Sequence, residues 1–331
     1  MTYQTAPADG TAPSDGTGPQ PPDAGTLRRR VTVSPAMCGH NSLFLGQIGD
    51  WTWETVGTLC GTDVLGARGA DGSPAYLAFY YYRVRGSRDF HLRSVSFGDV
   101  LDVTSRSFDF GSESVLTIHR IAAASAADPG RPLTAAEFYR GPAPGELHVE
   151  NFNRWVSRRR AGSNQGLVPA SPADFRHRRL PALPEEYSPR RAYGRARQTL
   201  SFCDEPPEEY TPVAEGFTTR YRIDITRDLN GVGLVYFASY FSFVDQAVLC
   251  QWRALGRDDG AFLRRRVVDQ QLCYAQNADP DTELELGVTV RARTADRAEE
   301  LFDVVIRDAT TGNLIAVSTQ RVYRQPEEEG Q

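Results

Sequence analysis

Residues 228–252 read DLNGVGLVYFASYFSFVDQAVLCQW. The segment opens with Asp228, Asn230 and Gly231, which are residue types that favour turns and helix caps, and it continues as an apolar run. Residues 236–256 are enough for a helix of about five turns, and this helix would be apolar on nearly every side. Such a helix is buried, which predicts a sheet that curls around it.

The same pattern occurs earlier in the chain. The loop CGHN at residues 38–41 leads to IGDWTWETVGTLCG at residues 48–61, which has helical period and ends at Gly61. When Asn41 is aligned with Asn230 without gaps, chemically similar residues fall opposite each other in the segments that follow. The order of the elements is the stronger argument. Both halves read as a loop, a central helix and then an antiparallel sheet.

Strand composition, rich in β-branched and aromatic residues, follows each helix. The expected strands are YLAFYYYRVRG (76–86), FGDVLDVTSRSFDF (97–110) and SVLTIHRI (114–121) in the first half, and RVVDQQLCY (266–274), ELELGVTVRAR (283–293), LFDVVIRD (301–308) and LIAVSTQRVYR (314–324) in the second. TTGN between the last two predicts a hairpin turn. A sheet wrapped around one apolar helix is the hot dog fold. The chain therefore predicts an α+β double hot dog whose two sheets join edge to edge.

The chain divides into five expected parts. Residues 1–26 predict a disordered tail, because they have almost no large apolar side chains to offset the entropy of ordering. Residues 27–125 predict the first hot dog and residues 210–325 the second. Between them, the Pro- and Arg-rich residues 126–209 predict an irregular connection packed on the domains. Residues 326–331 predict a second disordered tail.

Composition excludes several classes of function. All 37 basic residues are arginines, and the absence of lysine excludes Schiff-base chemistry and a P-loop lysine. The net charge of −5 gives no overall reason to bind nucleic acid or an anionic membrane. The sequence has neither a long apolar run nor the hydrophobic core of a signal peptide, so we expect a cytoplasmic protein. Histidines lack metal-ligand spacing, so no metal is expected.

Five segments resemble, in the same order, those of the bifunctional acyltransferase/decarboxylase of leinamycin-type polyketide biosynthesis. They are PAMCGHNSLFLGQIGDWTW (35–53), YLAFYYYRVRG (76–86), VENFNRWVSR (149–158), DLNGVGLVYFASYFSFVD (228–245) and RRVVDQQLCY (265–274). The resemblance extends from about Val31 to Tyr323. It implies an enzyme that takes methylmalonyl-CoA, forms an acyl ester on a tyrosine, loses CO2 and delivers a propionyl group to a phosphopantetheinylated acyl carrier protein. It also implies that no metal or organic cofactor is needed.

The resemblance implies that the acylated tyrosine lies in the strand after the first helix, which contains Tyr76, Tyr80, Tyr81 and Tyr82. We expect Tyr76, because the start of this strand is nearest the loop that would hold the thioester. A phenol with a pKa of about 10 needs an activating neighbour at neutral pH. His40 in the CGHN loop, as a general base or donor, and an arginine are the candidates. Packing is the alternative role for a strand tyrosine.

Decarboxylation of a malonyl-type thioester places negative charge on the thioester oxygen, so hydrogen-bond donors must face that atom. Backbone N–H groups at a helix start can do this. The NGVG run, Asn230, Gly231, Val232 and Gly233, predicts such a substrate-binding cradle, and Asn41 of CGHN is its counterpart in the other half. We expect both loops to face one thioester slot. A plain cap and turn is the alternative.

Two other functions fit the same fold. Hot dog thioesterases use a carboxylate near the central helix, so a thioesterase or dehydratase-like enzyme would act through Asp228 or His40, with Asp224 and Asp245 as further carboxylates. A non-catalytic protein would only bind an acyl carrier protein. Residues 158–160, three arginines, would either meet CoA phosphates or an acidic carrier surface, or form a solvated face. A homodimer is compatible with two hot dog units in one chain.

Overall fold

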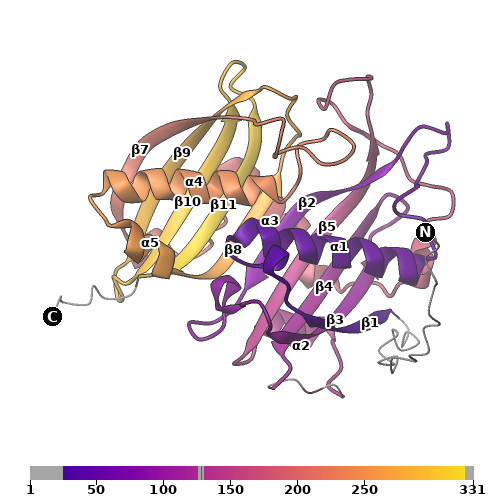
Figure 1. The fold of residues 1–331 in the computed structure, drawn as a ribbon, viewed down its shortest axis with the longest axis horizontal. Coiled ribbons are helices and arrows are strands. Elements are labelled where there is room, and N and C mark those ends of the chain that lie inside the picture. The colour runs from indigo at the N-terminus through magenta and orange to yellow at the C-terminus, as the bar shows by residue number, and fades with distance from the viewer. Residues whose placement is uncertain (1–24, 126–127, 129, 325–331) are drawn as a thin grey trace, which may run out of the picture.

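The computed structural model describes residues 25–125, 128 and 130–324. All of its named strands belong to one antiparallel sheet, and two long helices lie along the same face of that sheet (Figure 1). The strands are β1 (Thr26–Thr32), β2 (Tyr76–Arg85), β3 (Val100–Asp109), β4 (Ser114–Ala123), β5 (Glu146–Ser157), β6 (Val168–Pro169), β7 (Tyr210–Arg222), β8 (Arg266–Tyr274), β9 (Glu283–Arg293), β10 (Glu299–Asp308) and β11 (Leu314–Tyr323). The helices are α1 (Asn41–Cys60), α2 (Ala135–Arg140), α3 (Arg190–Thr199), α4 (Ser239–Ala254) and α5 (Asp259–Arg264), with short 3-10 turns at Pro35–Met37, Leu92–Ser94, His177–Arg179, Glu185–Tyr187 and Pro207–Glu209.

The strand order β1-β3-β4-β5-β2-β8-β11-β10-β9-β7 contains one pattern twice. In each half the spatial order is first, third, fourth, fifth and second strand, and the two second strands, β2 and β8, meet at the centre. Their antiparallel pairing extends from Tyr81 and Cys273 to Arg85 and Asp269. Helix α1 lies on the first half of the sheet and α4 on the second (Figure 1). The predicted double hot dog with sheets joined edge to edge is confirmed.

Strand β5 corrects the expected irregular connection over residues 126–209. It pairs with β4 on one side and β2 on the other, so it lies inside the first sheet. Nearly every residue of β5 is buried, including the polar Glu150 and Asn151, so the alternation that identifies a half-exposed strand is absent. In the first hot dog, helix α2 lies between β4 and β5 in the chain. In the second hot dog, the predicted TTGN turn joins the corresponding strands, β10 and β11, directly.

The helix boundaries differ from the predicted ones mainly at the N-terminal ends. Gly61, with a φ of 65°, terminates α1 as predicted, but α1 begins at Asn41, well before residue 48. Helix α4 begins at Ser239 rather than at residue 236. The backbone N–H of Tyr236 and the hydroxyl of Ser239 both donate to the carbonyl oxygen of Asp228, at 2.8 and 3.3 Å. This folds the segment before α4 into a turn.

Both faces of the sheet are covered. Tyr82 packs in the large core beneath α1 and α4, whereas the adjacent Tyr81 packs in a second cluster with Ala196 of α3 and Phe202. Consecutive side chains of a strand point to opposite faces. Helix α3 therefore covers the face of the sheet opposite to α1 and α4.

The expected tails fall mostly outside the described residues, which leave out 1–24 and 325–331. Thr26, which we counted with the first tail, instead begins β1 and pairs with Arg106 of β3. Within the part of the chain that the structure describes, no helix is long and apolar enough to cross a membrane. The same residues contain no group of three or more His, Cys, Asp or Glu side chains arranged to hold a metal ion.

Candidate functional site

A cavity of about 300 Å³ opens where the two central strands separate. Residues 76–80 of β2 have no described partner on β8, because the β2–β8 pairing begins only at Tyr81. At the other end the sheet stays closed, since the N–H of Gly86 donates to the carbonyl oxygen of Val268 at 2.7 Å. We call the opening the Tyr76 cavity. Its walls come from residues 76–80, from the last residue of β8 and the three after it (274–277), from Gly166 and Leu167, from Trp53 of α1, and from Asn230, Leu234, Val235, Phe237 and Tyr240 in and before α4.

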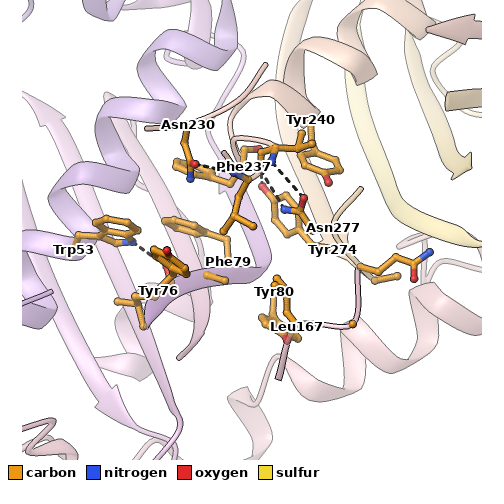
Figure 2. Close-up of a pocket in the computed structure, with 17 residues that line it drawn as sticks. Trp53, Tyr76, Phe79, Tyr80, Leu167, Asn230, Phe237, Tyr240, Tyr274 and Asn277 are labelled. Atoms are coloured by element: carbon orange, nitrogen blue, oxygen red, sulfur yellow. Dashed lines mark hydrogen bonds between the residues drawn. The ribbon is translucent and has the colours of Figure 1, made fainter. Parts of the chain in front are cut away.

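The walls of the Tyr76 cavity come from both hot dog units. Figure 2 shows Trp53, Tyr76 and Phe79 on one side and Tyr240, Tyr274 and Asn277 on the other. The second set belongs to α4, β8 and the residue run after β8, whereas the first belongs to α1 and β2. Neither half alone would enclose this space.

Two of the four candidate tyrosines serve in packing. The hydroxyl of Tyr81 donates to Oε1 of Gln271 at 3.0 Å, and that of Tyr82 donates to the carbonyl oxygen of Leu45 at 3.2 Å. Burial raises the pKa of both phenols well above the ordinary value. A phenol that is buried, hydrogen-bonded and hard to ionise is a poor nucleophile.

The other two candidates, Tyr76 and Tyr80, line the Tyr76 cavity and are partly exposed. Burial raises the pKa of Tyr80, and the neighbouring Arg154 opposes this shift. Tyr76 is the first residue of β2, where that strand begins beside the opening. Of the four candidate tyrosines, the geometry therefore leaves Tyr76 and Tyr80 as the ones that a ligand in the cavity can reach.

The Tyr76 cavity is lined without formal charge. Among its 17 described lining residues there is no Asp, Glu, Arg or His. Its polar side-chain groups are the tyrosine hydroxyls, the indole N–H of Trp53 and the amides of Asn230, Gln276 and Asn277. A charged group that enters such a space loses water and meets no opposite charge, so its charge is strongly disfavoured.

The NGVG run forms a closed turn beside this cavity. The N–H of Asn230 donates to Leu234 O at 2.9 Å, and the N–H of Gly233 donates to Asn230 O at 2.9 Å. Oδ1 of Asn230 accepts from the N–H groups of Val232 and Leu234, at 3.1 and 3.0 Å. The expected cradle at Val232 and Gly233 is therefore wrong, because these donors are engaged within the turn. Of the four NGVG residues Asn230 lines the cavity, whereas Gly231 does not.

Two side chains from the β5–β6 region hold the NGVG turn in place. Arg158 donates to the carbonyl oxygen of Val232 at 2.6 Å. Nδ2 of Asn164 donates to the carbonyl oxygens of Gly233 and Ala278, at 2.9 and 3.0 Å. Arg158 thus braces a turn, while Arg159 and Arg160 are exposed.

The CGHN loop lies away from the Tyr76 cavity. Nδ1 of His40 is 2.6 Å from Oγ of Ser42, which also accepts a hydrogen bond of 2.8 Å from Ser242. His40 lines a different pocket, between the start of α1 and α4, and Asn41 is buried. The structure brings Tyr76 together with Asn230 but not with His40 or Asn41. The predicted slot shared by both loops is wrong, and His40 is not placed to activate Tyr76.

Two of the three carboxylates considered for a thioesterase mechanism, Asp228 and Asp245, are engaged elsewhere. Asp228 is 4% exposed and accepts hydrogen bonds from the hydroxyl of Tyr221 and the N–H of Asp224, at 2.7 and 2.8 Å. Asp245 forms an ion pair of 2.7 Å with Arg265 and accepts a hydrogen bond of 3.0 Å from Asn41. Neither carboxylate lines the Tyr76 cavity, so both hold structure rather than face this space.

The second wall of the cavity was not identified from the sequence. The hydroxyl of Tyr274 donates to the carbonyl oxygen of Phe237 at 3.1 Å. The Asn277 amide exchanges two hydrogen bonds with the backbone of Val235, both 3.3 Å long. The available signal was the polar pair Gln276 and Asn277, which follows the end of β8 after Ala275. That signal does not reveal which part of the other half lies opposite.

Comparison with known proteins identifies the family and similar folds. Residues 28–204 match the protein family described as LnmK N-terminal Hot Dog Fold domain. Among solved structures, the chain is similar to "oleoyl thioesterase (putative)" from Lactobacillus plantarum, with a TM-score of 0.59, 10% identity, and coverage of 92% of this chain and 97% of that chain. It is also similar to the 12:0-ACP thioesterase from Umbellularia californica, with a TM-score of 0.52, 12% identity, and coverage of 91% and 94%.

At these identities the two solved structures show a shared fold. No match was found among curated protein sequences. The family match covers more than half of the chain, and the strand order repeats the same hot dog unit in the remainder. The chain therefore belongs to the family of the LnmK N-terminal Hot Dog Fold domain and carries it within a double hot dog.

Proposed function

We propose that the chain is an enzyme that decarboxylates methylmalonyl-CoA through an acyl ester on Tyr76 and transfers the propionyl group to an acyl carrier protein. Membership of the LnmK-type family supports the reaction class. The two similar solved structures are named as thioesterases, one of them for an acyl carrier protein substrate, which supports an acyl-thioester ligand. The observation that carries the proposal is that Tyr76 lines a cavity without charged side chains.

An uncharged cavity favours loss of CO2 from a malonyl-type group. The substrate carboxylate leaves water and meets no cation among the described lining residues, so its charged form is destabilised. When the bond between the α-carbon and the carboxylate breaks, the electron pair moves into the enolate, and CO2 leaves without charge. A proton from water then adds to the α-carbon and gives the propionyl group.

The enolate oxygen needs a donor as its charge develops. Nδ2 of Asn230 is the candidate, because Oδ1 of the same amide is fixed by the N–H groups of Val232 and Leu234. Among the described residues no hydrogen bond from this Nδ2 is made, which leaves it for a ligand in the cavity. A side chain held in one orientation before the substrate binds stabilises charge without reorganisation.

Acyl transfer breaks the thioester and forms an ester on the Tyr76 oxygen. The Tyr76 hydroxyl attacks the thioester carbonyl, and the phenolic proton leaves with the thiol of CoA. The thiol of the carrier protein then attacks the ester, and the phenol recovers its proton. Because the described lining offers no side-chain base, the proton moves through substrate groups or water.

Intact-mass spectrometry tests the proposal. The chain is incubated with methylmalonyl-CoA and a phosphopantetheinylated acyl carrier protein, and both proteins are weighed. We expect a propionyl adduct on the carrier protein, an acyl adduct on the enzyme and release of CO2. Free acid and CoA without need of the carrier would identify a thioesterase instead. Binding without turnover would identify a non-catalytic protein.

A further inference from the structure

A second space adjoins the Tyr76 cavity on the other face of the sheet. It is a groove of about 640 Å³ between α3, β5 and the turn at residues 110–114. We call it the arginine groove, because Arg154 of β5 and Arg190 and Arg197 of α3 line it. Tyr80 and Ala275 line both spaces, so the groove and the cavity meet where β2 and β8 separate.

The arginine groove has an excess of positive charge. Its three arginines face one acidic residue among the described lining, Glu113, which accepts a hydrogen bond of 2.9 Å from Arg154. The guanidinium groups of Arg190 and Arg197 are exposed and have no carboxylate partner in the described part of the chain. The uncharged cavity and the cationic groove therefore differ sharply in the groups they accept.

Aromatic rings restrain the three cations. The guanidinium carbon of Arg154 is 5.2 Å from the ring centroid of Tyr80. That of Arg190 is 5.5 Å from the Phe110 ring, and that of Arg197 is 5.6 Å from the Tyr193 ring. A cation over an aromatic face is attracted to it and loses freedom. Arginines restrained in this way bind an anion with a smaller entropic cost than free surface arginines.

We propose that the arginine groove binds the phosphate of a phosphopantetheine arm, and that the pantetheine passes between Tyr80 and Ala275 into the Tyr76 cavity. The inference rests on the proposed thioester function. Guanidinium groups bind phosphate through paired N–H donors. The arm needs no hydrogen bond of the sheet to break, because residues 76–80 of β2 are unpaired on this side. CoA and a carrier protein both carry this phosphate, so both would enter through the same groove.

Calorimetric titration of the full chain tests the inference with three probes, CoA, 4′-phosphopantetheine and pantetheine. We expect Arg190→Ala and Arg197→Ala each to weaken binding of the two phosphorylated probes by about tenfold. Binding of pantetheine should not change. Arg191→Ala is the matched control, because Arg191 is an exposed arginine of the same helix that does not line the groove. It should bind every probe as the unaltered chain does.

Four results would overturn the inference. In the first, the Arg190→Ala/Arg197→Ala double variant binds CoA as tightly as the unaltered chain does. In the second, the double variant loses affinity for pantetheine as much as for CoA, which would indicate a change of shape rather than of charge. If CoA binding alone fell, the groove would hold nucleotide phosphates instead of the pantetheine phosphate. Arg159→Ala should have no effect, and a loss there would place the phosphate at residues 158–160. These titrations need no turnover, so a failure of the propionyl transfer is recognised separately.

Discussion

The ring of Phe237 occupies the place where a side chain at Gly49 would stand. A β-carbon added at Gly49 would lie 2.1 Å from Cζ of Phe237. The same ring stacks on Phe79, with centroids 4.0 Å apart, and it lines the Tyr76 cavity. Gly49 belongs to α1 and Phe79 to β2, so one side chain from the second hot dog fits into a notch of the first.

Gly49→Ala should therefore displace Phe237 and deform the cavity. We expect a loss of about 1–3 kcal/mol in the free energy of unfolding, as for overpacked cores, together with weaker binding of CoA. Denaturant unfolding and calorimetry measure the two effects. Gly194→Ala in α3 is the control, because a β-carbon there meets nothing within 4 Å. It should be neutral or stabilising by about 0.4–1 kcal/mol. A Gly49→Ala protein with unchanged stability and binding would contradict the account.

Tyr76→Phe should abolish the acyl-enzyme and lower carrier acylation by a factor on the order of a thousand or more, because the ester oxygen is missing. Tyr80→Phe removes the phenol of the other strand β2 candidate that lines the cavity and should keep the acyl adduct. Intact mass reports the adduct, and near-UV circular dichroism reports the fold. An acyl adduct on the Tyr76→Phe protein, absent from the Tyr80→Phe protein, would move the nucleophile to Tyr80.

Asn230→Asp separates the two roles of the Asn230 amide, which accepts hydrogen bonds within the turn and is the candidate donor to the enolate. The aspartate keeps an oxygen that accepts from Val232 and Leu234, so the turn and the melting temperature should be preserved. It lacks the Nδ2 donor and adds a charge, so CO2 release should fall about 100- to 1,000-fold. Asn230→Ala should lose both the turn and the activity. Normal CO2 release by the aspartate variant would exclude Asn230 as the donor to the enolate.

His119 should make the fold sensitive to acid. Burial lowers its pKa from 6.5 to about 3, aided by the charge of Arg29. Its ring nitrogens contact the hydroxyls of Thr52 and Ser105, at 2.9 and 2.8 Å, and Asn151 lies beside it. Between these two pKa values the unfolded chain binds a proton that the folded chain does not, so the contribution is complete above pH 6.5 and is lost as pH falls towards 3.

The measurement is the urea midpoint as a function of pH. Below pH 6.5 the free energy of unfolding should fall by up to about 1.4 kcal/mol per pH unit for this histidine. Burial also lowers the pKa of His91 and His148, each to about 4, so both should add to the slope. The His119→Gln protein should have a lower free energy of unfolding at pH 7, and this free energy should fall less steeply as the pH is lowered. An unchanged slope in that variant would show that His119 is not responsible.

The sequence was sufficient for the elements whose pattern is local. Composition and alternation predict seven of the strands. Gly61, which has a positive φ in the structure, marks the C-terminal end of α1. Strand β5 was missed because both of its faces are buried, so polar residues such as Asn151 face inward and the alternation disappears.

The site was predicted less completely, because it depends on contacts between distant residues. Tyr76 and Asn230 were identified from the sequence. Their proximity was not, because it depends on the point at which β2 and β8 separate. The wall around Tyr274 lies opposite Tyr76 only in the assembled sheet. His40 was misplaced for the same reason, since an equivalent position in a repeated unit does not guarantee an equivalent environment.

The pairing of β2 with β8 at the centre of the sheet also limits the number of acyl groups that one chain can carry. A duplicated unit offers two related ends at the β2–β8 junction, yet here one end opens at Tyr76 and the other is joined by Gly86 and Val268. Two equal subunits related by a dyad would carry two identical sites. In the present chain the two ends of the junction differ, so this symmetry is absent. Acylation should therefore saturate at one acyl group per polypeptide.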